Sequence, residues 1–211
     1  MANHCYNYAT GTGPKEELER LKAVVDLLKD KENKVDNQVW CWSKIYPLFF
    51  TQNVGEVEET EESGEDKSFF DVYENWGSKW FDANFEIDPE GQDITISGDS
   101  AWSPVIPFFI ALCKEYKLEL EGSYEEPGMD FAGEYTINKD GEFSEVQMTY
   151  SQYEALNNPE GYWQRLTDDI EEGFYDSFPE ILTRLKADNF NVTSEDINQL
   201  TKLFDQYKKN E

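Results

Sequence analysis

Strand-like and helix-like patterns alternate along the first part of the sequence, and their order restricts the fold more than any other feature. An alternating segment at 5–10 precedes Gly11-Thr12-Gly13-Pro14, a turn whose proline suits the first position of a helix. Apolar residues then recur at helical spacing and predict an amphipathic helix over 14–31. These apolar residues are Leu18, Leu21, Val24, Val25 and Leu28.

A second strand-rich segment follows further along the chain. Alternating apolar residues predict strands over 80–88 and 93–98, joined by the turn at 89–91. Residues 104–116 are apolar nearly all round and predict a buried helix, and residues 117–124 alternate again. The order strand, helix, strand, strand, helix, strand is that of the split β-α-β plan, so we expect a ferredoxin-like antiparallel sheet in an α+β protein.

The remaining patterns add a hairpin and a helical tail. Residues 131–137 and 143–149 flank Asn138-Lys139-Asp140-Gly141, a strong hairpin turn. Beyond residue 150, Tyr162, Leu166, Ile170 and Phe174 recur every four residues, which predicts a helix. The expected domains are therefore a ferredoxin-like domain with an acidic loop insertion and a helical appendage packed on it. Their bounds are 1–150, 55–67 and 151–211, in that order.

The charge of the chain excludes several classes of partner. The sequence has 18 Lys and Arg against 45 Asp and Glu, a formal net charge of −27. Such a field repels the phosphates of nucleic acids and anionic membrane surfaces, so neither is an expected direct ligand. The acids are densest in the insertion and in the tail, where we expect a partner to bind. These candidate residues are Glu58, Glu59, Glu61, Glu62, Asp168, Asp169, Glu171 and Glu172.

The lack of a recognisable targeting signal and the spacing of the cysteines predict a reduced, cytoplasmic protein. The N-terminus has no basic segment followed by an apolar run, as a signal peptide has. The longest apolar stretches fall well short of the roughly 20 residues that span a bilayer. The three cysteines are odd in number and lack the spacing of a zinc or redox motif. We therefore expect a cytoplasmic location and free thiols.

No motif indicates catalysis. The single histidine, His4, lies beside Cys5 in a predicted strand, where adjacent side chains point to opposite faces. Gly11-Thr12-Gly13 lacks the further residues of a nucleotide-binding loop. The turn at 138–141 lacks the spaced ligands of a calcium loop. We expect no catalytic residues, no cofactor and no metal site, and thus not an enzyme.

Four segments together resemble a known family. They are Met1-Ala2-Asn3-His4-Cys5-Tyr6-Asn7 with Thr12-Gly13-Pro14, Asn75-Trp76-Gly77-Ser78-Lys79-Trp80, Ser100-Ala101-Trp102-Ser103-Pro104-Val105-Ile106-Pro107, and Tyr124-Glu125-Glu126-Pro127-Gly128-Met129-Asp130-Phe131-Ala132-Gly133. The combination resembles the YubB-type family of phage and plasmid proteins over about residues 1–145. The resemblance implies a ferredoxin-like fold and a home on mobile elements, and it supplies no catalytic residues. The acidic insertion and the helical tail depart from the family pattern.

The tryptophans of these segments allow two interpretations. Trp76 and Trp80 flank a flexible turn, and Trp102 precedes a predicted helix that Ser103 could cap. The rings either lock the loops onto the sheet or line a small pocket.

The sequence favours a non-enzymatic phage or mobile-element protein that binds and inhibits a basic, nucleic-acid-handling host protein. Carboxylates one helical turn apart have a spacing similar to that of nucleic-acid phosphates, so the chain would act as a nucleic-acid mimic of the anti-CRISPR or anti-restriction type. One alternative is a small-molecule or peptide-binding module with a tryptophan-lined pocket. Another is a hydrolase with a carboxylate-held metal, and a third is an acidic surface that only keeps the protein soluble.

Overall fold

The structure is a computed structural model that divides into two compact units, Met1–Gln147 and Met148–Glu211, and each unit is described here by itself. The predicted insertion at 55–67 lies outside the described residues. The described residues are 3–28, 34–35, 39–40, 77–78 and 80–210.

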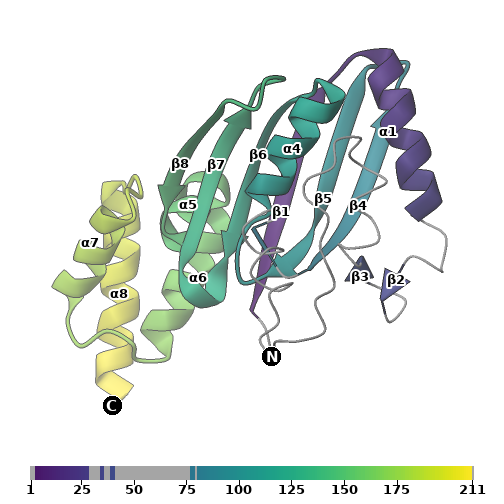
Figure 1. Ribbon diagram of the computed structural model, residues 1–211. Helices are drawn as coiled ribbons and strands as arrows, with labels where there is room; N and C mark the ends of the chain where they lie inside the picture. The colour runs from purple at the N-terminus through teal and green to yellow at the C-terminus, as the bar shows by residue number, and fades with distance from the viewer. Residues whose placement is uncertain (1–2, 29–33, 36–38, 41–76, 79, 211) are drawn as a thin grey trace. The chain divides into compact units, whose positions relative to one another are not determined.

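The first unit is built on a six-stranded sheet of order β4-β5-β1-β6-β7-β8. Its pairs from β4 to β7 are all antiparallel. The four strands β4-β5-β1-β6, with one helix after β1 and one after β5, form the ferredoxin-like arrangement expected from the sequence, and β7 and β8 are the added hairpin (Figure 1). The strands are β1 (His4–Thr12), β4 (Phe81–Asp88), β5 (Asp93–Ala101), β6 (Glu119–Glu126), β7 (Phe131–Ile137) and β8 (Phe143–Met148), with the short pair β2 (Lys34–Val35) and β3 (Val39–Trp40) forming a separate two-stranded sheet.

Two helices of this unit, α1 (Lys15–Leu28) and α4 (Ile106–Tyr116), lie on the same face of the sheet (Figure 1). In the strands from β4 to β7 of the sheet order, alternate residues face these helices, and the apolar side chains at these positions are buried. Phe81 of β4 meets Phe108 and Phe109 of α4 edge to face, with ring centroids 6.2 and 6.0 Å apart. One continuous apolar core therefore lies between the sheet and the two helices.

A buried asparagine links β1 to the start of α4. The Asn7 amide nitrogen donates to the carbonyl of Cys5 at 2.9 Å and to the hydroxyl of Ser100 at 2.8 Å. Its amide oxygen accepts from the backbone nitrogen of Val105, the N-cap residue of α4, at 3.0 Å. The expectation that Ser103 caps this helix was wrong, since its hydroxyl donates instead to the carbonyl of Gly77.

The second unit is helical, as expected for the tail. Its core is formed by the apolar stripes of these helices. Phe174 does not belong to that stripe, because α6 ends three residues earlier and Gly173 turns the chain with φ of 82°, which leaves the Phe174 ring 70% exposed. The helices are α5 (Tyr150–Asn157), α6 (Pro159–Glu171), α7 (Phe178–Ala187) and α8 (Ser194–Asn210).

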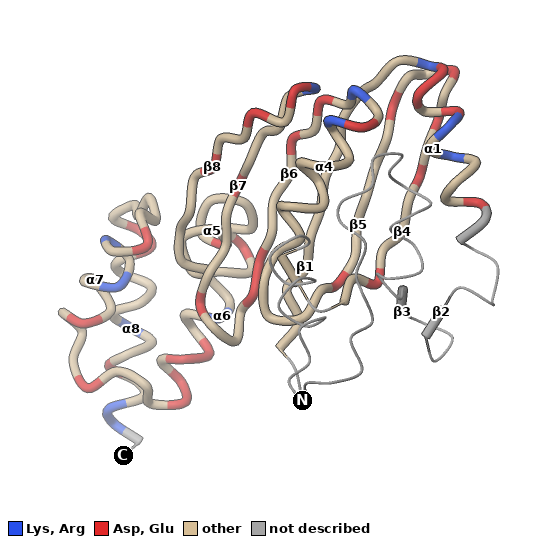
Figure 2. Tube along the Cα trace, in the orientation of Figure 1, with Lys and Arg blue, Asp and Glu red and all other residues tan. Residues whose placement is uncertain are grey.

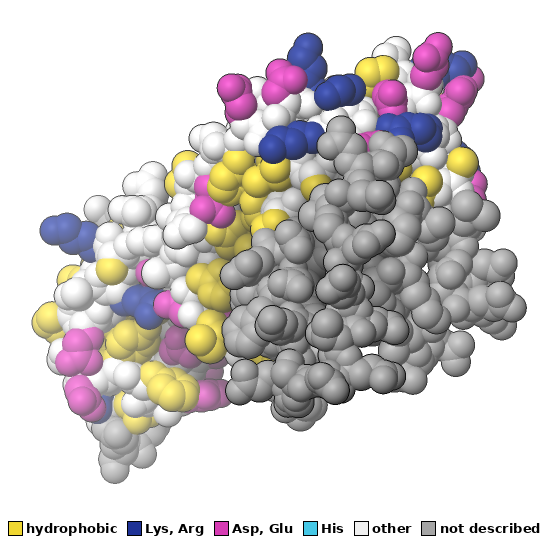
Figure 3. Space-filling model, in the orientation of Figure 1, with side chains coloured by type: hydrophobic (Ala, Val, Ile, Leu, Met, Phe, Trp, Pro, Cys, Tyr) yellow, Lys and Arg dark blue, Asp and Glu magenta, His cyan; other side chains and the backbone are white. Residues whose placement is uncertain are grey.

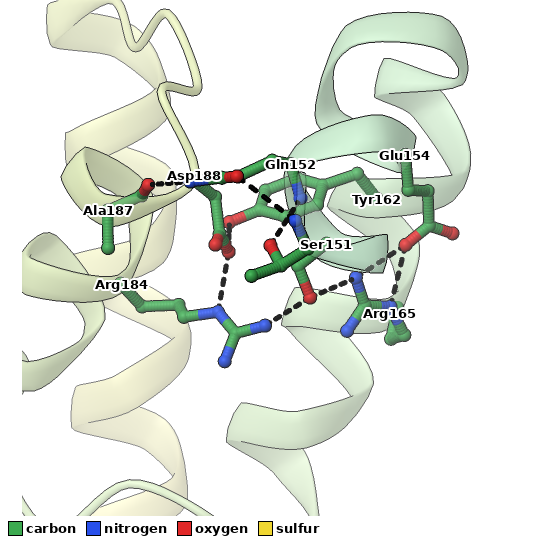
Figure 4. Close-up of polar contacts among 9 residues, drawn as sticks. Ser151, Gln152, Glu154, Tyr162, Arg165, Arg184, Ala187 and Asp188 are labelled. Carbon is green, nitrogen blue, oxygen red and sulfur yellow. Dashed lines mark hydrogen bonds and ion pairs between the residues drawn. The ribbon is translucent and has the colours of Figure 1, made fainter. Parts of the chain in front are cut away.

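A polar network joins α5, α6 and the end of α7 (Figure 4). The buried Asp188 carboxylate accepts from the Tyr162 hydroxyl at 2.8 Å and from the Arg184 Nε at 2.5 Å. Arg184 also donates to the Ser151 hydroxyl, which Arg165 approaches to 3.3 Å. Burial and the hydrogen bond to Asp188 raise the pKa of Tyr162. The network satisfies buried polar groups and has a structural role.

Candidate functional site

The predicted acids of the tail lie at the C-terminal end of α6. Asp168, Asp169 and Glu171 are in its last turn, and Glu172 is the C-cap residue. The Glu172 backbone nitrogen donates to the Asp168 carbonyl at 2.8 Å, so these two residues are one turn apart as predicted. Asp169 is half-buried, which raises the pKa of its carboxyl, while two nearby guanidinium groups oppose that shift. The other three side chains are exposed.

This position is electrostatically unfavourable for acids. A helix carries partial negative charge at its C-terminus, so carboxylates there reduce its stability. No basic residue lies in the last turn of α6. The Asp168 carboxylate accepts from the Gln164 amide at 2.8 Å, a neutral group. Helix stability therefore does not explain these charges.

The other predicted site residues divide into two groups. The acids of the insertion, Glu58, Glu59, Glu61 and Glu62, lie outside the described residues, and so does Trp76. Among the described tryptophans, Trp80 is half-buried and its ring meets the His4 ring edge to face, with centroids 5.2 Å apart. Trp102 is 43% exposed and has φ of 62°. Neither ring lines the hollow that the described residues of β1, β6 and β7 form.

The structure reveals a surface that sequence reasoning missed, on the side of the sheet away from α1 and α4. Along β1, Tyr6 and Tyr8 alternate with the buried residues Cys5, Asn7 and Ala9. The two tyrosines therefore point away from the helices, and they are 42% and 40% exposed. They lie in a strand that has neighbours on both sides, β5 and β6.

Carboxylates surround the two tyrosines on the same side. We call this surface the acidic sheet face and define it by the outward positions of β4, β5, β1 and β6. The strand register places two pairs of like charge directly opposite each other, Asp82 with Asp99 and Asp88 with Asp93. Such pairs destabilise a sheet. The carboxylates of the face are Asp82, Glu86, Asp88, Asp93, Asp99, Glu119, Glu121 and Glu125.

The described basic residues of the first unit lie outside the strands that form this surface. None of the six strands of the large sheet contains a lysine or an arginine. Figure 2 shows acidic but no basic positions along these strands, and Figure 3 shows basic side chains along the upper edge of the helix-bearing side. Arg20 of α1, for example, pairs with Glu17 and Glu115 at 2.7 Å. Among the described residues, the Asp, Glu, Lys and Arg positions of the acidic sheet face thus carry one sign of charge, which is negative.

A hollow of about 550 Å³ lies where β1, β6, β7 and the turn before β8 meet. Glu119 and Glu121 of β6 line it together with Thr12 and Glu142. The Asn138 amide donates to the Glu142 carboxylate at 2.6 Å, which fixes that side chain at the rim. The hollow gives one end of the acidic sheet face a concave shape.

The described residues contain neither a cluster of metal-ligating side chains nor a membrane-spanning helix. No three His, Cys, Asp or Glu side chains in this part of the chain are grouped so that they could hold a metal ion. No helix in the same part is long and apolar enough to cross a membrane.

Part of the chain is similar to a known protein family. Residues 75–166 match the family model described as the ferredoxin-like domain in Api92-like protein. No curated protein and no solved structure matches the chain. The finer resemblance to the YubB-type family stays a prediction. The segment from β4 through α4 to β8, which supplies most of the large sheet, is therefore similar to that ferredoxin-like domain, and the predicted α+β fold class is confirmed.

Proposed function

We propose that this protein binds and inhibits a basic, nucleic-acid-handling protein of its host, as anti-restriction and anti-CRISPR proteins do, and that it acts by binding rather than by catalysis. The observation that carries the proposal is the one-signed charge of the acidic sheet face, where Tyr6 and Tyr8 are exposed among carboxylates. Charge of one sign speeds encounter with a cationic surface, and exposed aromatic rings supply contact area at short range.

The placement of the charges supports a specific role for them. A protein that needs acids only for solubility gains nothing by setting Asp82 opposite Asp99 within a sheet. The acids at the end of α6 are a second case in which charge opposes local stability. The resemblance to a phage and plasmid family supports a host protein as the target.

The test is a capture and inhibition experiment. The immobilised chain is incubated with bacterial lysate freed of nucleic acid, and bound proteins are eluted with increasing salt. Each captured protein is then purified, and its activity on DNA is measured at rising concentrations of the chain. We expect basic nucleic-acid-binding proteins in the eluate, and we expect the chain to inhibit their activity in a salt-dependent manner.

A matched pair of variants separates the acidic sheet face from general charge. One variant neutralises Asp82 and Glu86 on the face, and the other neutralises Glu16 and Glu19, which are exposed on α1. The first should weaken both capture and inhibition, and the second should not. Equal effects of the two variants, or captured proteins whose activity the chain leaves unchanged, would contradict the proposal.

A further inference from the structure

We infer that the acidic sheet face binds an arginine-rich segment of the partner, with guanidinium groups stacked on Tyr6 and Tyr8 and held by the carboxylates beside them. The inference rests on the proposed function, because it specifies which cationic chemistry the same surface selects. The ligand that we infer for this face is a segment of a protein. The first argument for such a ligand is that its positive charge complements the negative charge of the face.

The surroundings of Tyr6 match an arginine more closely than a lysine. In the strand register Tyr6 lies opposite Asp99 of β5 and opposite Glu125 of β6. Side chains directly opposite each other have Cβ atoms about 4.5–5.5 Å apart. A guanidinium group stacks flat on an aromatic ring and directs its N–H donors outward in a plane parallel to the ring, toward such carboxylates. A lysine ammonium group is a point charge that lacks this planar fork.

Tyr8 repeats the arrangement one step along the strand. It lies opposite Ser97 and Ser123, so its nearest carboxylates are at the diagonal positions. The carboxylates at diagonal positions are those of Asp99, Glu121 and Glu125, about 7–8 Å away and within reach of a long side chain. The two rings are two residues apart in one strand, or about 6.8 Å. This distance matches alternate side chains of an extended segment, so arginines separated by one residue fit the pair.

Hydrogen bonds on the helix-facing side of the sheet hold in place the strand that carries the rings. Asn7 lies between the two tyrosines, and its buried amide bonds to β5 and to the first residues before α4. A platform fixed in this way loses little conformational entropy when a partner binds. Preorganisation thus favours recognition by stacking, which requires defined ring positions.

Single-stranded nucleic acid is the competing ligand for an aromatic sheet face. Some RNA-binding domains place aromatic rings on a four-stranded sheet and stack bases on them. Such binding also needs positive charge along the phosphates. Here Asp99 and Glu125 flank Tyr6, and none of the six strands carries a lysine or an arginine. The observations therefore favour a cationic peptide over an oligonucleotide.

The experiment compares two labelled peptides that differ only in the cation. One alternates arginine with serine, and the other has lysine at every arginine position, so length and charge are equal. Binding of each peptide, and of a labelled single-stranded RNA, to the full-length chain is measured by fluorescence anisotropy at low and physiological salt. Stacking on one exposed ring changes affinity by about two- to five-fold. With two rings we expect the arginine peptide to bind about five-fold tighter or more.

Variants place the effect on the sheet. Tyr6→Leu combined with Tyr8→Leu keeps apolar bulk but removes the rings, and both side chains are exposed, so the fold should persist, as a thermal melt verifies. The preference for arginine should vanish, because the arginine peptide should lose more affinity than the lysine peptide. Phe174→Leu, which removes an exposed ring of the second unit, should preserve the preference.

Each remaining outcome overturns the inference. Equal affinity for the two peptides removes the arginine selectivity but leaves the proposed function standing, since both peptides are cationic. A preference that survives loss of both tyrosines places the arginine site elsewhere. Tighter binding of the RNA than of either peptide contradicts both the inference and the proposed function.

Discussion

Neutralising one acid of the acidic sheet face should stabilise the fold. Asp82 lies opposite Asp99 in the register of β4 and β5, while the Asp99 carboxylate has the His4 imidazole 3.9 Å away on its other side. Asp82→Asn removes the repulsion, retains the shape of the side chain and leaves the contact between His4 and Asp99 intact. The free energy of unfolding should therefore rise.

The expected gain follows from the separation of the two charges. Two unit charges about 5 Å apart repel by about 0.8 kcal/mol in water. Screening at physiological salt, where the Debye length is about 8 Å, reduces this to about 0.4 kcal/mol. For a chain of this size each kcal/mol shifts the melting temperature by about 2–4 °C, so a gain of about 0.4 kcal/mol raises it by about 1–2 °C.

The assay is urea denaturation followed by tryptophan fluorescence at low and high salt, with Glu16→Gln as the matched control. Glu16 lies in the first turn of α1, where a carboxylate stabilises the helix, so its neutralisation should lower the free energy of unfolding by about 0.3–1 kcal/mol. The same loss of charge thus has opposite effects at the two positions. A destabilised Asp82→Asn variant, or a gain that does not shrink with salt, would refute the argument that repulsion is built into this face.

Four further outcomes can be checked on the purified chain. Asp188→Ala leaves the buried Tyr162 hydroxyl without its acceptor and should cost about 1–3 kcal/mol in urea denaturation, and Asp188→Asn should recover part of that loss. Burial raises the pKa of the Cys5 and Cys113 thiols to about 12, so in a variant whose third cysteine is serine, iodoacetamide should label neither until the chain unfolds. For the same reason the folded state retains the two thiol protons at a pH where the unfolded state, with a thiol pKa of about 9, has lost them. The free energy of unfolding should therefore fall by about 1.4 kcal/mol per pH unit for each thiol between about pH 9 and 12. Unchanged stability across that range would contradict the burial of the thiols. Glu172→Gln should stabilise α6 by about 0.3–1 kcal/mol at low salt, as a thermal melt would show, and a loss of stability would contradict the helix-dipole argument.

Local patterns were sufficient to predict the framework of the fold. The strand expected over 93–98 is β5, which extends to Ala101, and the hairpin turn at 138–141 does connect β7 and β8. Period-two alternation and turn chemistry are properties of neighbouring residues, so a single sequence contains them. The hydrogen bond at the start of α4 could not be predicted in this way, because the Val105 backbone nitrogen donates to the side chain of Asn7, which lies 98 positions away in the sequence.

The acidic sheet face could not be predicted for a related reason. The alternation of Tyr6 and Tyr8 with Cys5 and Asn7 is visible in the sequence, but it does not say which face the helices cover. Nor does it say that Asp99 of another strand lies opposite Tyr6, because register is a long-range property. The local density of acids along the sequence instead predicted a site at runs of neighbouring acids. A sheet brings together acids from separate strands, which such a density does not detect.

The energetic balance explains how the fold can carry such a face. Fully burying one large apolar side chain contributes about 1.5–3 kcal/mol, and the core below the sheet buries Phe81, Phe108 and Phe109 completely. Repulsion between Asp82 and Asp99 costs less than any one of these contacts. Sites where local rules are broken while the rest of a protein obeys them are where function is expected. The acids of the sheet break such a rule twice, because the repulsion between Asp82 and Asp99 is repeated between Asp88 and Asp93. The apolar core on the opposite side of the same strands offsets this electrostatic cost.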